Sequence, residues 1–306
     1  MILSIFFIVG GAILLYWGAH ELLRSSVQIA LAFGLSPLVI GLTLVALATS
    51  LPEALTSVIA QVQDVSGDVA LGNVLGSNIA NIGLVLGVAL LICPIQIPRK
   101  IKAIEMSILL VFSFVLALVM LKGFVGRWMG ACFFVLACGY LLFEWIYGKN
   151  GEPIPKSKGA LGKAILFFFL SVLALIFGAK GLVDGGVGLA HVLHVPERII
   201  AVSVIAIGTS LPELVTVIVA AAHRKDSLIL GNVVGSNILN LLFIVGLSAL
   251  IRPIIFSHQL LMNDIPIMIG FAGVLWISMW RRTVLPRLIG AFYLLLYIGY
   301  LVFVMH

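Results

Sequence analysis

Two glutamates are the first candidates for chemistry in this chain. Glu53 and Glu213 lie deep within long apolar stretches, and each ends the same pentapeptide, Thr-Ser-Leu-Pro-Glu, at residues 49–53 and 209–213. A carboxylate inside a membrane is energetically expensive and is a functional candidate by default. The other ten Asp and Glu fall in loops or near the ends of apolar stretches. We therefore expect Glu53 and Glu213 to bind a cation; the alternative is a pair of structural acids hydrogen-bonded to neighbouring helices.

A second repeated segment offers neutral oxygen ligands. LGNVLGSNIAN at residues 71–81 recurs as LGNVVGSNILN at 230–240. Each copy places two asparagines and a serine four residues apart, on one face of a helix: Asn73, Ser77 and Asn81, then Asn232, Ser236 and Asn240. The glycines beside this face are typical of close helix packing. Asn78 and Asn237 lie off the face, and we expect them to hydrogen-bond between helices and not to bind an ion.

Pro52 and Pro212 are expected to break the helices that carry the glutamates. A proline inside a helix removes a backbone donor and clashes with the preceding turn, and it also disfavours helical geometry in the residue before it. We expect each break to free main-chain oxygens near the middle of the membrane. The oxygens concerned belong to Ala46 and Ala206, beside the hydroxyls of Thr49, Ser50, Thr209 and Ser210. The alternative is a helix that is merely kinked.

The candidate site holds only oxygen ligands. The three cysteines, Cys93, Cys132 and Cys138, have no zinc-like spacing, and the six histidines fall in loops or at the ends of apolar stretches. Sulfur and imidazole suit softer metals, whereas oxygen ligands suit hard cations such as Ca²⁺. Two carboxylates match one Ca²⁺ or a pair of Na⁺. The chemistry that these residues predict is cation exchange.

The composition places these residues in a membrane protein. Of 306 residues, 62% are hydrophobic and only 10% are charged, whereas soluble domains carry roughly 25% charged residues. This excludes cytosolic enzymes, disordered scaffolds and secreted disulfide domains. Ten apolar stretches are long enough to cross a bilayer, which takes about 20 residues. They are residues 2–23, 36–63, 68–93, 103–121, 126–147, 163–183, 196–222, 227–251, 263–281 and 287–304.

The chain is a duplication of a five-span unit. The two repeated segments recur at offsets of 160 and 159 residues. We expect a first repeat at 1–147, a short linker at 148–162 and a second repeat at 163–306. Because five is odd, the second unit must run through the membrane in the opposite sense. The predicted fold is all-α and polytopic, with ten transmembrane helices in two inverted repeats. Helices 2, 3, 7 and 8 are expected to be broken or bent around an ion site at the midplane.

Loop charges predict the orientation. With ten spans, thirteen of the eighteen Lys and Arg lie on one side. By the positive-inside rule that side is cytoplasmic, so both termini are predicted to be extracytoplasmic. The linker is then cytoplasmic and too short for a regulatory domain. The net charge of +6 is spread over short loops and forms no stripe for nucleic acid.

The doubled TSLPE and GN-x-x-GSN-x-x-N segments resemble the α-repeats of the cation/calcium antiporter superfamily, in particular the sodium/calcium exchangers and their prokaryotic homologues. The resemblance implies that Glu53 and Glu213 are shared by Ca²⁺ and Na⁺ and that Asn81 and Asn240 complete the centre. It implies further oxygens from Thr49, Ser50, Ser77, Thr209, Ser210 and Ser236 and from the main chain of Ala46 and Ala206. It also implies antiport driven by a Na⁺ gradient, with spans 1 and 6 sliding past the rest; a site built from two inverted halves suits alternating access. The short linker, with no large cytoplasmic loop, predicts a prokaryotic exchanger in the cell (inner) membrane. Neither a cofactor nor an obligate protein partner is implied.

Two positions depart from the family pattern. Many microbial and potassium-dependent members carry Asp where this chain has Asn240, so we expect no K⁺ requirement here. Ala48 stands where the second copy has Gly208, which is expected to stiffen the first helix break.

Three other functions are open on the same sequence. H⁺/Ca²⁺ exchange is the nearest, because a carboxylate buried in a membrane can carry a proton in place of Na⁺. A channel is less consistent with broken helices around carboxylates. An intramembrane enzyme is the remote alternative: the sequence has no His-Glu-x-x-His motif and no histidine predicted at midspan. We expect the protein not to be an enzyme.

Overall fold

The computed structural model describes residues 2–63, 67–148, 161–193 and 208–305. The first half contains the α- and π-helical (η) segments α1 (Ile2–Phe33), α2 (Pro37–Ile40), η1 (Gly41–Val45), α3 (Ala46–Thr49), α4 (Leu51–Val62), α5 (Gly67–Ala80), η2 (Asn81–Leu86), α6 (Gly87–Ile92), η3 (Ile101–Glu105), α7 (Met106–Met120) and α8 (Arg127–Gly148). The second half contains α9 (Leu161–Val192), α12 (Leu211–Ala222), α13 (Asp226–Leu239), η5 (Asn240–Ile244), α14 (Val245–Ile251), η6 (Leu260–Asp264), α15 (Ile265–Trp280) and α16 (Arg287–Met305). Helices satisfy their own backbone hydrogen bonds, as a chain in lipid requires.

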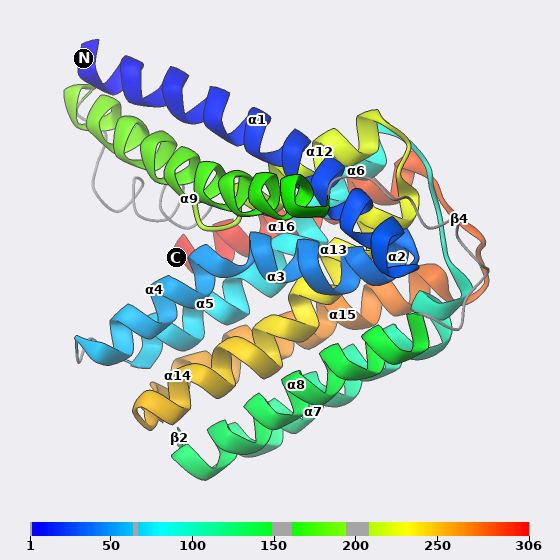
Figure 1. The fold of residues 1–306 in the computed structure, drawn as a ribbon. Helices are drawn as coiled ribbons and strands as arrows, with labels where there is room; N and C mark the ends of the chain where they lie inside the picture. The colour runs from blue at the N-terminus through cyan, green and yellow to red at the C-terminus, as the bar shows by residue number, and fades with distance from the viewer. Residues whose placement is uncertain (1, 64–66, 149–160, 194–207, 306) are drawn as a thin grey trace.

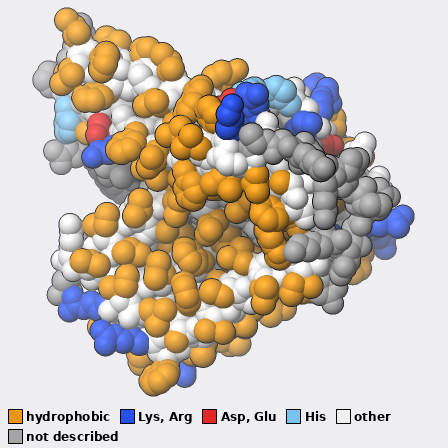
Figure 2. All heavy atoms as spheres, viewed as in Figure 1, with side chains coloured by type: hydrophobic (Ala, Val, Ile, Leu, Met, Phe, Trp, Pro, Cys, Tyr) orange, Lys and Arg blue, Asp and Glu red, His pale blue; other side chains and the backbone are white. Residues whose placement is uncertain are grey.

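The protein is a multi-pass integral membrane protein. Within the described residues, eight helices are long and apolar enough to cross a bilayer, and the bent pair formed by α2–α3 and α4 makes a ninth. Figure 2 shows hydrophobic side chains over most of the visible face, with Lys and Arg in small groups away from its middle. The predicted seventh span, 196–222, is described only over α12, because residues 194–207 lie outside the described part. The count of ten spans therefore stays a prediction.

The predicted break of the second span is confirmed. Residues 37–49 and 51–62 are bent by 44° at Ser50, whose ψ of 5° is not helical. Pro52 lies in the first turn of α4, where its missing N–H costs no hydrogen bond within α4 itself. In the second copy, α12 begins after Ser210 with nearly the same backbone angles and with Pro212 in its first turn. The break thus converts the middle of a span into the start of a helix.

π-helical turns bend the helices that carry the asparagine segments. η2 begins at Asn81 and η5 at Asn240, the equivalent positions of the two copies. Such turns often occur at functional sites, because the wider turn re-aims side chains and backbone groups. The third span and α13–α14 are therefore irregular where the sequence predicted broken or bent helices.

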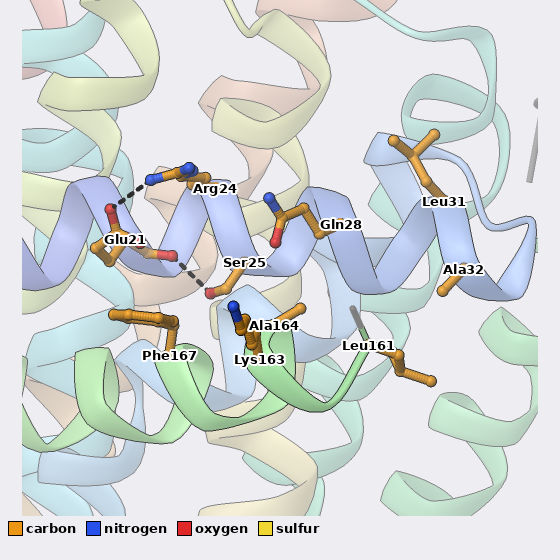
Figure 3. A pocket seen from close by; sticks show the side chains of 10 residues that line it. All are labelled: Glu21, Arg24, Ser25, Gln28, Leu31, Ala32, Leu161, Lys163, Ala164 and Phe167. Carbon is orange, nitrogen blue, oxygen red and sulfur yellow. Dashed lines mark hydrogen bonds and ion pairs between the residues drawn. The ribbon is translucent and has the colours of Figure 1, made fainter. Parts of the chain in front are cut away.

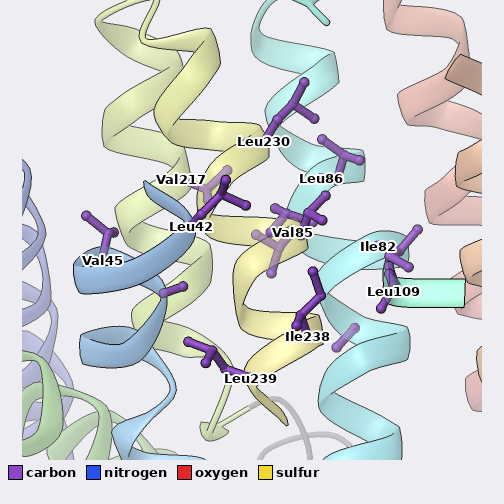
Figure 4. Packing of buried hydrophobic residues seen from close by; sticks show 14 of the residues in the cluster. Leu42, Val45, Ile82, Val85, Leu86, Leu109, Val217, Leu230, Ile238 and Leu239 are labelled. Atoms are coloured by element: carbon purple, nitrogen blue, oxygen red, sulfur yellow. The ribbon is translucent and has the colours of Figure 1, made fainter. Parts of the chain in front are cut away.

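The centre of the molecule is built around α13. All residues from Leu228 to Leu239 are buried. Side chains of η1, η2 and α12 meet this helix in Figure 4, where Leu42, Val85 and Ile238 are among the labelled contacts. Gly235 permits the approach of η1, because a Cβ there would lie 2.6 Å from the Leu42 carbonyl oxygen. The apolar core thus holds the two repeated segments against each other.

Helices α1 and α9 run side by side and project away from the other helices (Figure 1). Their contact depends on small residues: a Cβ on Gly178 would lie 2.9 Å from the Gly11 carbonyl oxygen, and one on Gly18 would lie 3.0 Å from that of Ser171. Without room for side chains, the two backbones approach closely.

Short strands link the two copies of the repeat. β1 (Ile95–Gln96) pairs antiparallel with β4 (Val284–Leu285), and β2 (Phe124–Val125) pairs with β3 (Ile254–Ile255). Beside the strands, Arg287 donates to the Ile92 carbonyl at 2.9 Å and Arg127 to the Ile251 carbonyl at 3.1 Å. Each pairing joins one copy to the other, and the two sets of contacts occupy equivalent positions of the repeat.

The structure corrects several details of the sequence analysis. α1 continues to Phe33 and α9 to Val192, about ten residues beyond the predicted ends at 23 and 183, because polar residues extend both helices past their apolar segments. The linker expected at 148–162 lies almost wholly outside the described residues. Glu105 and Glu144 lie near span ends as expected, but both are fully buried.

Candidate functional site

The two glutamates occupy matching positions at the starts of α4 and α12. Each is the third residue of its helix, and the exposed fraction is 0% for Glu53 and 1% for Glu213. A helix N-terminus carries free N–H groups and a partial positive charge, both of which stabilise a carboxylate. The helix breaks therefore make these buried positions tolerable for an acid.

Each carboxylate is held by a serine from the other copy. Ser50 Oγ donates to Glu213 Oε1 at 3.1 Å, and Ser210 Oγ donates to Glu53 Oε1 at 3.5 Å. Ser77 Oγ from α5 also donates to Glu53 Oε1 at 3.5 Å. This crossed arrangement brings both TSLPE segments into one site. The two carboxylates are also close enough to repel each other electrostatically.

A second set of contacts joins the α3 end to α13. Thr49 Oγ1 donates to Asn232 Oδ1 at 3.1 Å, and Ser236 Oγ lies 3.4 Å from the same oxygen. Ser236 Oγ also lies 3.5 Å from the Ala46 carbonyl oxygen. The hydroxyls predicted as ligands therefore lie within one hydrogen-bonded layer beside the glutamates.

The expectation that the break frees the Ala46 carbonyl is wrong. Its oxygen accepts the Ser50 N–H at 3.0 Å and lies 3.3 Å from Thr49 Oγ1. A proline removes the bond to the residue four positions earlier, so Pro52 releases the carbonyl of Ala48, not that of Ala46. Ala46 retains one lone pair that a cation can use.

The equivalent residues of the second copy are only partly visible. Thr209 is half-buried and makes no hydrogen bond to the described part of the chain, and Ala206 lies outside the described residues. The two copies of the site can thus be compared fully only at the serines, the glutamates and the asparagine segments.

Four buried oxygens at this site have no hydrogen-bond donor within the described residues. They belong to the four residues predicted as central ligands: Glu53 Oε2, Glu213 Oε2, Asn81 Oδ1 and Asn240 Oδ1. Buried polar atoms without partners are rare in native proteins and call for an explanation. A hard cation supplies one, since carboxylate and amide oxygens are its preferred ligands.

The ligand set differs from that of a tightly held structural metal. No group of three or more His, Cys, Asp or Glu could hold a metal within the described residues. Two carboxylates with neutral oxygens favour a hard cation that binds reversibly over a soft metal held by thiolate or imidazole.

Of the two off-face asparagines, Asn78 hydrogen-bonds between helices as predicted, but the prediction is wrong for Asn237, whose buried side-chain amide has no hydrogen-bond partner within the described residues. Asn78 Nδ2 donates to the Asn237 carbonyl at 3.3 Å, and Asn78 Oδ1 accepts Asn240 Nδ2 at 3.0 Å. Asn240 is thereby oriented with its own carbonyl oxygen unpaired. Asn73 behaves in a way the sequence did not predict, because its Nδ2 donates to the Glu53 carbonyl at 3.0 Å and supports the α4 backbone.

Sequence analysis missed a second buried polar cluster, between η3 with the preceding Lys100 and α8. Lys100 Nζ lies 2.7 Å from Glu144 Oε2 and 3.8 Å from Glu105 Oε1, and Tyr140 donates to Glu105 Oε2 at 3.0 Å. The internal repeat could have pointed to the Tyr140–Glu105 pair, because the second copy holds an equivalent pair. Tyr300 and Asp264, at offsets of 160 and 159 from Tyr140 and Glu105, form the same tyrosine–carboxylate contact at 3.2 Å.

A helical membrane protein with broken helices around a buried, all-oxygen site is of the class of membrane ion transporters. A family model for the sodium/calcium exchanger protein matches the chain over residues 3–146 and again over 163–306. The resemblance found in the sequence is confirmed: the chain belongs to the sodium/calcium exchanger family. It is a transporter and not an enzyme.

Individual relatives cover nearly the whole chain. Sodium/calcium exchanger MaX1 of Methanosarcina acetivorans is 32% identical over 95% of both chains. Inner membrane protein YrbG of Escherichia coli is 30% identical over 94% of this chain and 91% of YrbG. Among solved structures, the sodium-calcium exchanger NCX_Mj soaked without Na⁺ and Ca²⁺ superposes with a TM-score of 0.85, at 29% identity and with 97% of both chains covered.

Proposed function

We propose that this protein exchanges Na⁺ for Ca²⁺ across the membrane and that both ions bind between Glu53 and Glu213. The crossed serine–glutamate contacts are the observation that carries the proposal, because they bring one carboxylate from each copy into a single site. Their two negative charges balance one Ca²⁺ or two Na⁺. Because one Ca²⁺ and two Na⁺ each neutralise the two carboxylates, Ca²⁺ and Na⁺ can replace one another at the site.

The remaining ligands follow from the unpaired oxygens. Asn81 and Asn240 offer their amide oxygens to the ion. The hydroxyls of Thr49, Ser50, Ser77, Thr209, Ser210 and Ser236 and the main-chain oxygens of Ala46 and Ala206 complete the proposed set. No resident cofactor takes part, and Ca²⁺ and Na⁺ are the substrates.

The choice of ions is supported by the relatives. MaX1 is named a sodium/calcium exchanger, and a structure of NCX_Mj with a TM-score of 0.86 comes from a crystal soaked in Na⁺ and Sr²⁺. Sr²⁺ is a divalent cation of the same chemical group as Ca²⁺. We transfer both kinds of ion to this chain because it offers the same class of hard-oxygen ligand.

Alternating access requires a site that can open to either side. Two inverted repeats provide such a site, because a pseudo-two-fold axis relates the two halves that enclose it. The proposed repeats are 1–147 and 163–306, joined by a linker at 148–162. The reciprocal pairing of β1 with β4 and of β2 with β3 supports a two-fold relation between the halves. We propose that both termini are extracytoplasmic and that the membrane is a prokaryotic inner membrane.

The direct test is Ca²⁺ uptake into proteoliposomes. Vesicles loaded with Na⁺ are compared with vesicles that contain K⁺ alone and with vesicles that carry a proton gradient. We expect uptake only with internal Na⁺ in the wild-type protein, and none in Glu213→Gln. Asp264→Asn, which alters a carboxyl that contacts Tyr300 outside the proposed ligand set, should retain uptake.

Two outcomes would change the proposal. Uptake driven by a proton gradient without Na⁺ would establish H⁺/Ca²⁺ exchange on the same scaffold. Full Na⁺-dependent uptake by Glu213→Gln would show that the transported ions do not need this carboxylate. A monodisperse elution profile for each variant establishes that loss of uptake is not loss of folding.

A further inference from the structure

A cavity separates α1 from α9 at one end of this helix pair. It has a volume of about 250 Å³ and lies between the second half of α1 and the first turns of α9 (Figure 3). The α1 wall includes Glu21, Arg24 and Gln28, and the α9 wall includes Lys163 and Phe167. Both walls also include apolar side chains, Leu31 and Ala32 on α1 and Leu161 and Ala164 on α9, so the charged and polar groups lie within a partly apolar cavity.

The cavity carries an excess of hydrogen-bond donors and of positive charge. Arg24 Nη1 lies 3.3 Å from Glu21 Oε1, which leaves the remaining guanidinium N–H groups available, and the Arg24 side chain is 64% exposed. Lys163 and Gln28 make no hydrogen bond or ion pair with the described part of the chain. With Glu21 counted, one net positive charge remains. The lining is suited to an anion.

The opposite end of the same helix pair is closed. Glu21, Ser25 and Gln28 have Gly181, Gly185 and Gly188 as their equivalents at an offset of 160 residues. A Cβ on Gly185 would lie 2.7 Å from the Ser4 carbonyl oxygen, and one on Gly188 would lie 2.8 Å from Ser4 Oγ. Glycines thus let the helices touch there, whereas larger polar residues hold them apart at the cavity.

This contrast makes the cavity specific to one face of the membrane. The ion site uses residues that both copies share, but the cavity uses residues that the second copy replaces: Lys163 corresponds to Leu3, and Arg24 to Asp184. A ligand found on both sides of the membrane would not need such an asymmetry. Arg24 and Lys163 belong to the side predicted to be cytoplasmic.

We propose that this cavity binds the phosphate group of an anionic phospholipid. Basic pockets between transmembrane helices on the cytoplasmic side are suited to such headgroups. Arg24, Gln28 and Lys163 offer donors to the phosphate oxygens, and Phe167, which is 40% exposed, flanks the cavity on the surface of α9. The neighbouring Leu166, 56% exposed, continues this apolar surface and can contact the acyl chains. The cytoplasmic assignment rests on the proposed orientation, but the ligand chemistry does not.

The test is lipid binding to the purified full-length protein in neutral detergent, measured by native mass spectrometry. Phosphatidylglycerol is titrated against phosphatidylcholine, and soluble glycerol phosphate is added as a competitor. The variant Arg24→Gln with Lys163→Gln removes both cations from the cavity. The matched control, Arg99→Gln with Lys102→Gln, removes two cations from a loop predicted to lie on the same side.

We expect the wild-type protein and the control to prefer phosphatidylglycerol, and the cavity variant to bind it about tenfold more weakly. If the wild type binds glycerol phosphate but not phosphatidylglycerol, and the cavity variant binds neither, the cavity takes a phosphate ester from solution and the assignment to a lipid is overturned. The proposal would also be overturned if the cavity variant and the control lost affinity for phosphatidylglycerol equally. The same holds if the wild type bound phosphatidylcholine as tightly as phosphatidylglycerol. Should the double variant be aggregated, Lys163→Gln and Arg99→Gln replace the two doubles. The assay needs no transport, so its failure leaves the ion-exchange proposal intact.

Discussion

At the scale of single residues, the site depends on reciprocal contacts between the two copies. Ser50 and Ser210 each hold the glutamate of the other copy, and the second oxygen of each carboxylate is left unpaired. A hydrogen bond to a charged group is worth roughly 1.5–3 kcal/mol. In the proposed function, the serines orient both carboxylates before an ion arrives, which reduces the cost of binding.

Ser50→Ala tests this orientation. The change removes the 3.1 Å contact to Glu213, and we expect the Kd for Ca²⁺ to rise at least about tenfold. Ser210→Ala should raise it less, because its contact to Glu53 is longer, at 3.5 Å. Isothermal titration calorimetry measures both. Ser113→Ala, which removes a buried hydroxyl bonded to its own helix at Leu109, is the control and should bind Ca²⁺ like the wild type.

The structure brings the predicted central residues together, but the sequence did not predict their contacts. Repetition of TSLPE, together with an acid inside an apolar stretch, was enough to select Glu53 and Glu213 as the central pair. It could not show that Ser50 reaches the glutamate of the other copy, because that contact depends on how the copies pack. Glu105 and Glu144 were passed over for a related reason: Lys100 contacts Glu144 and Tyr140 contacts Glu105 only because the η3 segment packs against α8.

At the scale of elements, the α1–α9 pair is held together by close backbone contact. Gly11, Gly18 and Gly178 all lie where a side chain would collide with the opposite helix. Helices in lipid gain little from the hydrophobic effect when they associate, so such surfaces are held together mainly by close van der Waals packing. The family resemblance implies that spans 1 and 6 slide past the rest, and in that proposal α1 and α9 move together as one pair.

Gly178→Ala tests the contact. The added Cβ would lie 2.8 Å from Leu15 N, so the helices must separate, at a cost typical of overpacking, roughly 1–3 kcal/mol. We expect a melting temperature lower by several degrees and slower transport. Gly10→Ala is the matched control, because it lies in the same helix pair and a Cβ there meets nothing within 4 Å. Equal melting temperatures for Gly178→Ala and the wild type would contradict the proposed packing.

The lengths of the elements show why hydrophobic stretches locate spans but not helix ends. The apolar run of α1 stops at Leu23, and the helix continues for ten residues. Arg24 pairs with Glu21 on the outside, while Ser25 Oγ donates to the Glu21 carbonyl at 2.6 Å on the inside. These local contacts favour helix beyond the apolar segment, and a hydropathy window does not register them. The proline break, by contrast, has a strictly local cause and was predicted at the correct residues.

At the scale of the whole molecule, the links between the copies follow one pattern. One set of contacts consists of the β1–β4 pairing and the hydrogen bond from Arg287 to Ile92. The other set consists of the β2–β3 pairing and the hydrogen bond from Arg127 to Ile251, which lie at the equivalent positions of the repeat. In the proposed topology the first set is cytoplasmic and the second is extracytoplasmic. On each face of the membrane, a short strand pairing and an arginine–carbonyl hydrogen bond would then join the two copies.

Cysteine labelling tests that topology. In a background without the three native cysteines, Arg99→Cys and Lys122→Cys place single thiols on exposed loop residues. We expect a membrane-impermeant maleimide to label residue 122 in intact cells and residue 99 only after the cells are opened. The reverse pattern would invert the orientation, and labelling of both positions in intact cells would contradict the assignment of α7 as a complete span.

The claim that matters most is that one pair of carboxylates binds both ions. The most direct measurement is equilibrium binding of radioactive Ca²⁺ to the purified protein, with Na⁺ as competitor, in the wild type, Glu53→Gln, Glu213→Gln and Glu105→Gln. Glu105 is the matched control, because it is as fully buried as Glu53 but contacts Tyr140 and Lys100. We predict that the wild type and Glu105→Gln bind Ca²⁺ and release it as Na⁺ rises, whereas Glu53→Gln and Glu213→Gln bind no measurable Ca²⁺. Retention of Na⁺-sensitive Ca²⁺ binding in both site variants would contradict the account.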